Sequence, residues 1–314
     1  MPDSSHDRIV TPVRARAVVI VGPTASGKSD VAMALAERRS DMEIVAVDAM
    51  QVYRRMDIGT AKPTPADQRA VAHHCIDLVD ADAPFTVSDF QAAATTAMSA
   101  IEERGHTPVL VAGTGLYLTS VIDHLTLPGE WPAIRAELET ISNIESLYAR
   151  LTVLDPLAAT RIGPTNGRRI VRALEVCLGS GMPFSSFGPG TNAYPPISTS
   201  QIGLRWSRDA LTERVAARVR RMIEHGLVDE VASLLSSPGG MSRTARQALG
   251  YKELISVIEG DRVLSEAVNE IIVRTRQFAV RQERWFRRDP RIRWVDITAD
   301  PVAEALPVLQ EYFT

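Results

Sequence analysis

Eight consecutive residues constrain this chain more than any other feature of its sequence. Gly22 to Ser29, GPTASGKS, matches the pattern G-x-x-x-x-G-K-[ST] at every position. A short β-branched run, Ala17 to Val21, precedes the motif, and good helix formers follow it from Asp30 to Arg39. A buried strand, a glycine-rich loop and a helix form the context in which this motif binds phosphate. The sequence therefore predicts a phosphate-binding loop at the end of a parallel strand.

The chemistry of such a loop explains its residue types. Consecutive backbone N–H groups surround a phosphate, and the helix N-terminus adds partial positive charge. We expect Lys28 to supply a point charge and the Ser29 hydroxyl to ligate a Mg²⁺ ion that bridges phosphate oxygens. The predicted phosphate-binding residues are Gly22, Pro23, Thr24, Ala25, Ser26, Gly27, Lys28 and Ser29. The alternative, a turn with an incidental lysine, is weak because the flanking strand and helix are both in place.

The loop predicts phosphate binding but not the type of reaction. A nucleotide hydrolase or kinase usually carries a second apolar strand that ends in Asp, which holds Mg²⁺ from the far side. The best later strand here, Val109 to Ala112, runs into Gly113-Thr114-Gly115 without an Asp. Its absence weakens the hydrolase interpretation, although a small-molecule P-loop kinase stays open as an alternative.

A carboxylate follows the next apolar run. Ile44 to Val47 reads as a buried strand, and Asp48 stands at its carboxyl end. Ligands bind at this edge of open α/β sheets, so Asp48 should face the phosphate loop if the two strands are parallel. A carboxylate beside phosphates is unfavourable unless it ligates a metal through water or accepts a proton from a nucleophile. The structural alternative, in which Asp48 caps the following turn, also stays open.

The composition bounds the class of protein. The chain has 314 residues, 45% hydrophobic and 23% charged, which is enough for one large domain or two smaller ones. Its net charge of -3 is not typical of a nucleic-acid-binding protein, but the net charge of a whole chain can hide a basic face. Cys75 and Cys177 stand in unrelated contexts, which favours a reducing compartment over a disulfide framework. With no apolar run long enough for a membrane span, we expect a cytoplasmic protein.

Six segments resemble one known family in their order. They are GPTASGKS, VDAMQVYRRMDIGTAKP, AGTGLYL, RRIVRALEV, QALGYKE and TRQFAVRQERWF. Together, from about Val18 to Trp294, they resemble the bacterial tRNA dimethylallyltransferases, the isopentenyl transferases that modify adenosine-37 of tRNA. The DIGTAKP and GTGLY segments are especially specific to that family.

The resemblance implies a complete reaction. The partners would be dimethylallyl diphosphate and the tRNA anticodon stem-loop, and the diphosphate in the loop would leave as the prenyl carbon passes to N6 of the adenine. Asp48 would accept the proton from the attacking amine. Thr114 resembles the family's threonine near the reactive centre, and a hydrogen bond from its hydroxyl to substrate is our inference. The alternative for Thr114 is a helix N-cap.

Three positions depart from the family's usual pattern. Ala49 stands where Ser is usual, and Ala112 begins what is commonly a Gly-Gly-Thr segment. Neither change removes an essential acid, base or phosphate donor. Val280 stands where the family commonly has Lys, so the resemblance implies one fewer contact to the RNA backbone here.

Arginines and aromatic residues are interleaved late in the chain. Arg clusters bind RNA phosphates, and aromatic planes stack splayed bases, whereas the plainer alternative is a solvated helix face over an aromatic core. We expect Phe278 and Trp285, seven residues apart, to pack inward while the opposite face contacts RNA. Arg214 and Arg218 could reach either the diphosphate or RNA. The residues predicted to contact tRNA from the resemblance are Asp48, Ala49, Met50, Gln51, Thr114, Arg135, Arg168, Arg169, Arg172, Gln247, Gly250, Tyr251, Lys252, Thr275, Arg276, Gln277, Arg281 and Gln282.

The expected fold class is α/β, with a P-loop NTPase-like core in which helices flank a parallel sheet. We expect residues 17–122 and 200–314 to form this catalytic core with its C-terminal helices. Residues 123–199 should form an inserted, mostly helical subdomain, and residues 1–16 a flexible tail. We further expect a monomer.

Two other function classes compete with prenyl transfer. A small-molecule P-loop kinase explains GPTASGKS but not the Arg-rich C-terminal helices or the order of the motifs. A non-catalytic RNA-binding module explains the arginines but leaves the phosphate loop and Asp48 idle. The sequence favours the tRNA prenyltransferase.

Overall fold

The computed structural model describes residues 17–313, so the tail predicted for residues 1–16 lies outside the described residues. The chain divides into two compact units. The first comprises residues 1–118 and 196–314, and the second comprises residues 119–195. Among the described residues, no helix is long and apolar enough to cross a membrane.

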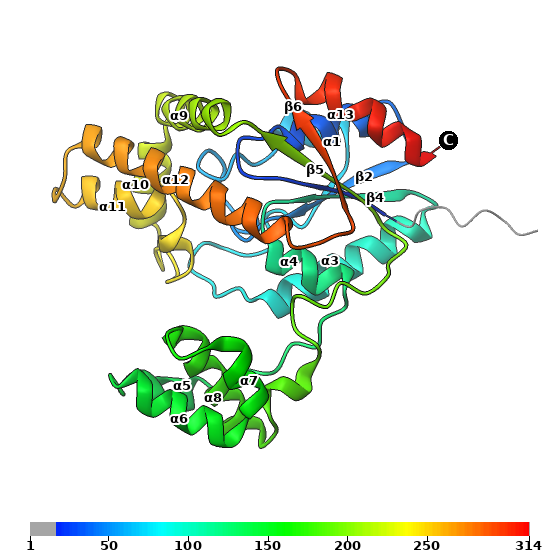
Figure 1. Cartoon of the computed structure of the whole chain (residues 1–314). Coiled ribbons are helices and arrows are strands. Elements are labelled where there is room, and N and C mark those ends of the chain that lie inside the picture. The colour runs from blue at the N-terminus through cyan, green and yellow to red at the C-terminus, as the bar shows by residue number, and fades with distance from the viewer. Residues whose placement is uncertain (1–16, 314) are drawn as a thin grey trace, which may run out of the picture. The chain divides into compact units, whose positions relative to one another are not determined.

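A six-stranded parallel sheet forms the centre of the first unit (Figure 1). Its strands are β1 (Val18–Val21), β2 (Met42–Val47), β3 (His73–His74), β4 (Thr107–Ala112), β5 (Ser200–Trp206) and β6 (Ile292–Ile297), in the order β3-β2-β4-β1-β5-β6. Ala112 pairs in register with both Val21 and Val47, so β1, β2 and β4 end at one level. The loops that follow these three strands therefore meet at the carboxyl edge of the sheet.

Helices cover both faces of this sheet (Figure 1). α1 (Lys28–Glu37) and α13 (Pro301–Gln310) pack on one face, where Leu35 and Leu309 join Ile20 and Ile202 in a buried cluster. α3 (Val87–Glu103) and α4 (Gly115–Ile122) lie on the other face. Thr86 starts α3 with a capping box, because its side chain accepts from Asp89 N and the Asp89 carboxylate accepts from Thr86 N.

A second group of helices extends the first unit. It contains α9 (Arg208–Glu224), α10 (Leu227–Ser236), α11 (Tyr251–Ile258) and the long α12 (Leu264–Phe286), while the short α2 (Pro65–Ala70) precedes β3. The buried stripe of α12 consists of Ala267, Ile271, Thr275, Ala279, Gln282 and Phe286. These residues repeat every three or four positions, as one face of a helix does.

The amino edge of the sheet holds a buried carboxylate with three hydrogen-bonding partners. Glu43 of β2 accepts from Arg104 Nη2 at 2.7 Å, and lies 2.6 Å from His74 Nε2 and 2.8 Å from His106 Nδ1. Arg104 lowers the pKa of Glu43 to about 2, and the two histidine hydrogen bonds act in the same direction. This cluster joins β2 to β3 and to the start of β4.

The second unit is helical. α5 (Pro132–Glu139), α6 (Ile144–Leu154), α7 (Pro156–Ile162) and α8 (Gly167–Ser180) enclose their own core, which includes Leu138, Leu151, Ile170 and Leu174. Gly179 lies so close to the Trp131 ring that any side chain there would overlap the ring.

Candidate active site

The phosphate loop links β1 to α1 in the expected way. Gly27 adopts a φ of 92°, and a side chain at this position would overlap Pro301. Gly22 is equally restricted, because a Cβ there would lie 2.8 Å from Ser26 Oγ. Lys28 and Ser29 then begin α1, so the free backbone N–H groups of its first turn point toward the loop.

Cationic side chains surround this loop. Lys28 Nζ donates to Pro23 O at 2.8 Å. Burial and, to a lesser extent, the neighbouring charge of Arg218 together lower the pKa of Lys28 to about 7, against the opposing effect of Asp48. Burial also lowers the pKa of Arg218. Arg214 Nε donates to Ala25 O at 2.8 Å, and the charge of Arg218 acts on Lys28, so these two arginines of α9 lie beside the phosphate loop.

Trp206, at the end of β5, supports the phosphate loop, and none of the sequence motifs includes it. Its indole Nε1 donates to Ser26 O at 2.9 Å, and the Arg214 guanidinium lies 4.3 Å from its ring centroid. An aromatic residue with a polar tip at the carboxyl end of a strand was the available signal.

Asp48 has two differently placed carboxylate oxygens. Oδ1 accepts from Met50 N at 2.8 Å and from Gln51 N at 3.3 Å, so the turn-capping alternative accounts for this atom. Oδ2 is directed toward Gly113, where an added Cβ would lie 3.5 Å from it. Asp48 thus fixes its own loop with one oxygen while the other faces the loop that follows β4.

Thr114 and Asp48 belong to loops that are hydrogen-bonded to each other. The Thr114 hydroxyl accepts from Ala49 N at 3.2 Å. Gly113 N and Thr114 N both donate to Val47 O, at 3.2 and 3.3 Å. Because the hydroxyl accepts from Ala49, it keeps its own hydrogen to donate elsewhere.

The DIGTAKP segment, Asp57 to Pro63, is held together by the buried side chain of Lys62 and by Gln51. Lys62, whose side chain is 2% exposed, donates to Tyr53 O at 2.8 Å and to Asp57 Oδ1 and Asp77 Oδ1, both at 2.6 Å. Gln51 Nε2 donates to Thr60 O and Ala61 O, each at 3.2 Å. Lys62 is therefore a structural cation.

Glu230 of α10 fixes the same segment from the other side. Its carboxylate accepts from Asp57 N at 2.9 Å, Ile58 N at 2.7 Å and Gly59 N at 3.2 Å, and from the Tyr251 hydroxyl at 2.5 Å. Burial raises the pKa of Tyr251, which is fully buried. Tyr251 is predicted from the family resemblance to contact RNA, but its ring packs on Gly59 and its hydroxyl donates to Glu230.

Comparison with known proteins identifies the family. Residues 51–289 match the family described as IPP transferase, and residues 15–78 match isopentenyl transferase. The tRNA dimethylallyltransferase of Streptomyces coelicolor is 45% identical over 287 residues, which cover 90% of this chain and 91% of that protein. The one from Geobacter metallireducens is 46% identical over 288 residues, covering 90% and 93%. The chain belongs to the tRNA dimethylallyltransferase family.

Solved structures agree with this family assignment. The tRNA isopentenylpyrophosphate transferase of Bacillus halodurans has a TM-score of 0.69 at 37% identity, covering 95% of this chain and 96% of that one. A eukaryotic dimethylallyltransferase described as acting on tRNA has a TM-score of 0.75 at 25% identity, covering 89% and 73%. The expected α/β fold with a parallel sheet flanked by helices is confirmed.

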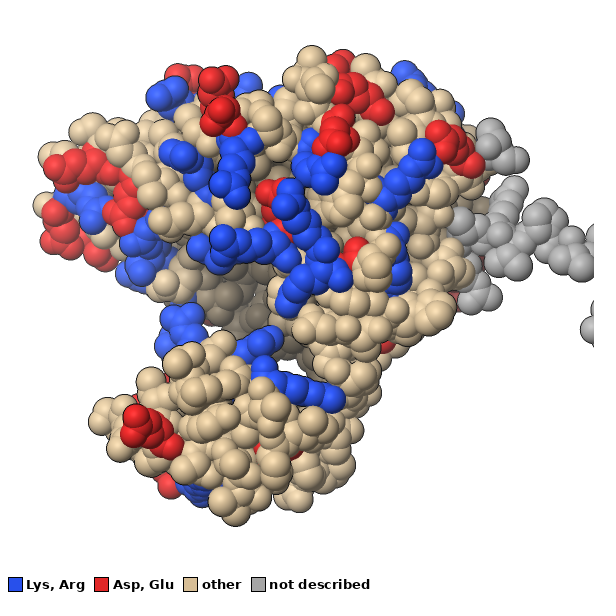
Figure 2. All heavy atoms as spheres, in the orientation of Figure 1, with Lys and Arg blue, Asp and Glu red and all other residues tan. Residues whose placement is uncertain are grey.

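The residues expected to contact tRNA in this family fall into exposed and buried groups. Figure 2 shows Lys and Arg side chains gathered on one face of the first unit, around the C-terminal part of α12. On α12 and around α11 the exposed members are Gln247, Lys252, Arg276, Gln277 and Arg281. Gly250, Thr275 and Gln282 are buried, so these three residues do not lie on the exposed face that was predicted to contact RNA. The buried aromatic of α12 is Phe286, while Phe278 and Trp285 are only half-buried.

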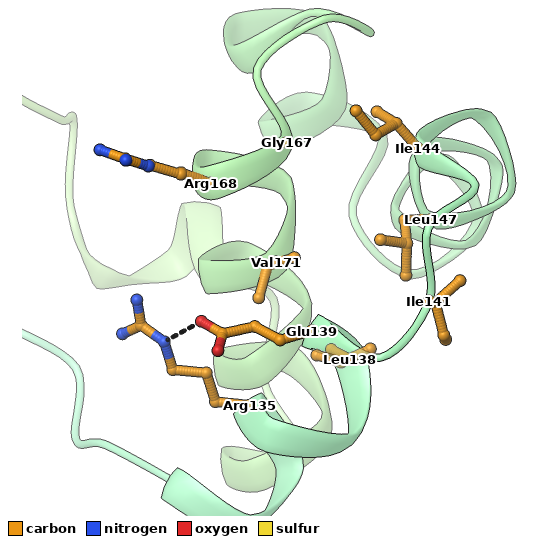
Figure 3. Close-up of a pocket in the computed structure, with 9 residues that line it drawn as sticks. All are labelled: Arg135, Leu138, Glu139, Ile141, Ile144, Leu147, Gly167, Arg168 and Val171. Atoms are coloured by element: carbon orange, nitrogen blue, oxygen red, sulfur yellow. Dashed lines mark hydrogen bonds and ion pairs between the residues drawn. The ribbon is translucent and has the colours of Figure 1, made fainter.

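The second unit carries the remaining predicted arginines. Arg135, Arg168 and Arg169 are exposed, and the first two line a small pocket of about 200 Å³ between α5, α6 and α8 (Figure 3). Arg172 differs from them. Its Nη2 donates to Pro128 O at 2.9 Å and its Nη1 lies 2.9 Å from Glu175 Oε1, so this guanidinium is engaged within the unit.

Proposed function

We propose that this protein transfers a dimethylallyl group from dimethylallyl diphosphate to N6 of adenosine-37 in tRNA and releases diphosphate. The observation that carries the proposal is the convergence of Asp48, Thr114 and a complete phosphate loop at one edge of the sheet. Family membership supplies the reaction class. The protein would act as a monomer in the cytoplasm.

The first half of the reaction is the departure of diphosphate. The bond between the prenyl carbon and the diphosphate oxygen breaks, and negative charge develops on the leaving group. Backbone N–H groups of the loop, Lys28 and Arg218 are placed to stabilise this charge, and fixed donors need no reorganisation as the charge appears. Arg214 shapes the loop through its hydrogen bond to Ala25 O.

The second half is the attack of the adenine amine. N6 forms the new bond to the prenyl carbon and must lose one proton, which we assign to Asp48 Oδ2. The Thr114 hydroxyl donates its hydrogen to the substrate beside this carboxylate. Because Asp48 Oδ1 is already fixed by Met50 N and Gln51 N, the accepting oxygen keeps one orientation.

The residues present fit a Mg²⁺ ion that is held mainly by phosphate oxygens and water. Ser29 is exposed at the start of α1 and offers a hard oxygen ligand at this edge of the sheet. Among the described residues no group of three His, Cys, Asp or Glu side chains could hold a metal alone. Bound there, Mg²⁺ would neutralise part of the diphosphate charge.

The RNA would contact the exposed arginines of α12 and of the second unit. Arg276 and Arg281 of α12, and Arg135, Arg168 and Arg169 of the second unit, are accessible for phosphate contacts. Adenosine-37 must leave its stack in the anticodon loop to reach a carboxylate at the sheet edge, and unstacking costs a few kcal/mol. The phosphate contacts would offset this cost.

Nucleoside mass spectrometry tests the proposal directly. Unmodified tRNA is incubated with the protein, Mg²⁺ and dimethylallyl diphosphate, and then digested. We expect adenosine that gains one five-carbon prenyl unit at N6, with loss of this product for Asp48→Ala. No modified adenosine, together with transfer or hydrolysis of ATP phosphate in a parallel reaction, would instead favour the small-molecule kinase.

A further inference from the structure

One buried amide connects the two loops of the candidate active site. Gln282 of α12 accepts a hydrogen bond from Thr24 N at 2.8 Å through Oε1. Its Nε2 donates to Gly113 O at 2.7 Å. The residue is 7% exposed, and both ends of its amide are used.

The next turn of α12 holds the second loop from another direction. Trp285 lies three residues after Gln282, so both side chains point to the same side of the helix. Gly115 packs against the Trp285 ring so closely that any side chain there would overlap it. The segment from Gly113 to Gly115 is therefore fixed by a hydrogen bond at one end and by a ring at the other.

The bridge continues to the predicted base. Gly113 N donates to Val47 O, and the neighbouring Thr114 hydroxyl accepts from Ala49 N, next to Asp48. A hydrogen-bonded route thus runs from Thr24 through Gln282 to the loop that carries Thr114. Thr24 N–H belongs to the phosphate loop, but it donates to Gln282 and is therefore not available to bind a phosphate.

We propose that Gln282 is a positioning residue that sets the separation between the bound diphosphate and the Asp48–Thr114 pair. This inference rests on the proposed prenyl transfer. Gln282 meets backbone groups of the protein at both ends, so its loss should leave substrate affinity nearly intact. Transfer, in contrast, depends on alignment of the reacting atoms, and a displacement of about 1 Å can cost roughly a hundredfold in rate.

Two variants test the bridge. Gln282→Met keeps the length of the side chain and removes both hydrogen bonds. Gln282→Glu keeps an acceptor for Thr24 N but cannot donate to Gly113 O while ionised. Asn269→Met is the matched control, because Asn269 is an exposed amide on the same helix.

The expected result is a separation of kcat from KM. With full-length protein, we expect Gln282→Met to lower kcat for prenyl transfer by roughly 10- to 100-fold. The KM values for tRNA and dimethylallyl diphosphate should each change by less than about threefold, because no substrate contact is lost. Gln282→Glu should retain diphosphate affinity and lose kcat, and Asn269→Met should behave as wild type.

Other outcomes would overturn the inference. A raised KM for tRNA with unchanged kcat would make Gln282 an RNA contact, and a kcat equal to that of Asn269→Met would make the bridge dispensable. If Gln282→Met does not fold, Gln282→Glu decides, because it conserves one hydrogen bond and the side-chain shape. A wild-type protein that forms no prenylated adenosine would refute the proposed function itself, which keeps the two failures distinguishable.

Discussion

Strand β2 carries one carboxylate at its start and another just beyond its end, and the two have opposite surroundings. Glu43 is buried against Arg104, His74 and His106, so both of its oxygens are occupied. Asp48 uses Oδ1 to fix a turn and directs Oδ2 toward the loop after β4. A saturated carboxylate stabilises the fold, whereas a partly satisfied one can take up a proton.

The largest effect should come from Asp48. Asp48→Asn keeps an acceptor for Met50 N but removes the negative charge, so kcat should fall by roughly 10² to 10⁴, the usual contribution of a general base. Single-turnover transfer measures the rate, and urea unfolding checks that stability is unchanged. A transfer rate for Asp48→Asn within tenfold of wild type would show that Asp48 is not the base. The proposed functional difference between Asp48 and Glu43 would then be wrong.

Lys28 should make diphosphate binding depend on pH. Its pKa, lowered to about 7, leaves the free protein with a partly neutral amine above that pH, while the bound diphosphate favours the ammonium form. Affinity should therefore fall as pH rises above 7, by up to about tenfold per pH unit for one linked proton. Calorimetry between pH 6 and 9 measures this slope. Lys28→Met is the control for titration of the ligand, and an equal slope in that variant would contradict the prediction.

Glu43 should affect stability and leave catalysis alone. Glu43→Gln breaks charge-assisted hydrogen bonds to Arg104 and should lower the free energy of unfolding at pH 7 by about 1–3 kcal/mol. Because the folded pKa is depressed to about 2, this stabilisation is complete above the unfolded pKa and is lost as pH falls from about 4.5 toward 2. Urea titrations at pH 7 and pH 3 should show the two proteins converging in acid. A lowered kcat in a fully folded Glu43→Gln variant would contradict the prediction that Glu43 affects stability alone.

The smallest effect concerns one exposed arginine. Arg276→Ala should weaken tRNA binding and reduce the slope of log affinity against log salt by about one, as expected for one lost phosphate contact. Arg274→Ala is the matched control, since Arg274 is paired with Glu253 at 3.1 Å and also with Glu270. Filter binding at several salt concentrations gives both slopes. If Arg276→Ala and Arg274→Ala show the same salt dependence of tRNA binding, the prediction that Arg276 alone contacts a phosphate is wrong.

Local patterns predicted the phosphate loop and its edge of the sheet. GPTASGKS is contiguous, and parallel strands end together, so the meeting of Lys28 and Asp48 followed from elementary topology, whereas Thr114 was expected there from the family resemblance. The two alternatives for Asp48 do not exclude each other, since only Oδ1 caps the turn and Oδ2 is the oxygen proposed to accept the proton. Sequence could not separate diphosphate from RNA for Arg214 and Arg218, because their distance to the loop depends on how α9 packs.

The sequence motifs could not predict the residues that hold the site loops in place. Gln282 and Thr24 are 258 positions apart, and Glu230 reaches the DIGTAKP segment from a different helix. A usable signal did exist in α12, where Thr275 and Gln282 occupy positions of the buried stripe. A polar residue in an apolar stripe indicates a specific buried partner. The seven-residue spacing of Phe278 and Trp285 was misleading, because the fully buried aromatic is Phe286.

The packing of Trp206 and Trp285 gives the protein its own optical reporters. The chain has four tryptophans, and these two contact different loops of the candidate site, one through Ser26 O of the phosphate loop and the other on Gly115. Indole emission responds to local charge and polarity, so diphosphate should perturb Trp206 and movement of the Thr114 loop should perturb Trp285. With either Trp206 or Trp285 replaced by Phe, the fluorescence of the other would report on one loop alone. The two variants would then show when each substrate binds, without an attached dye.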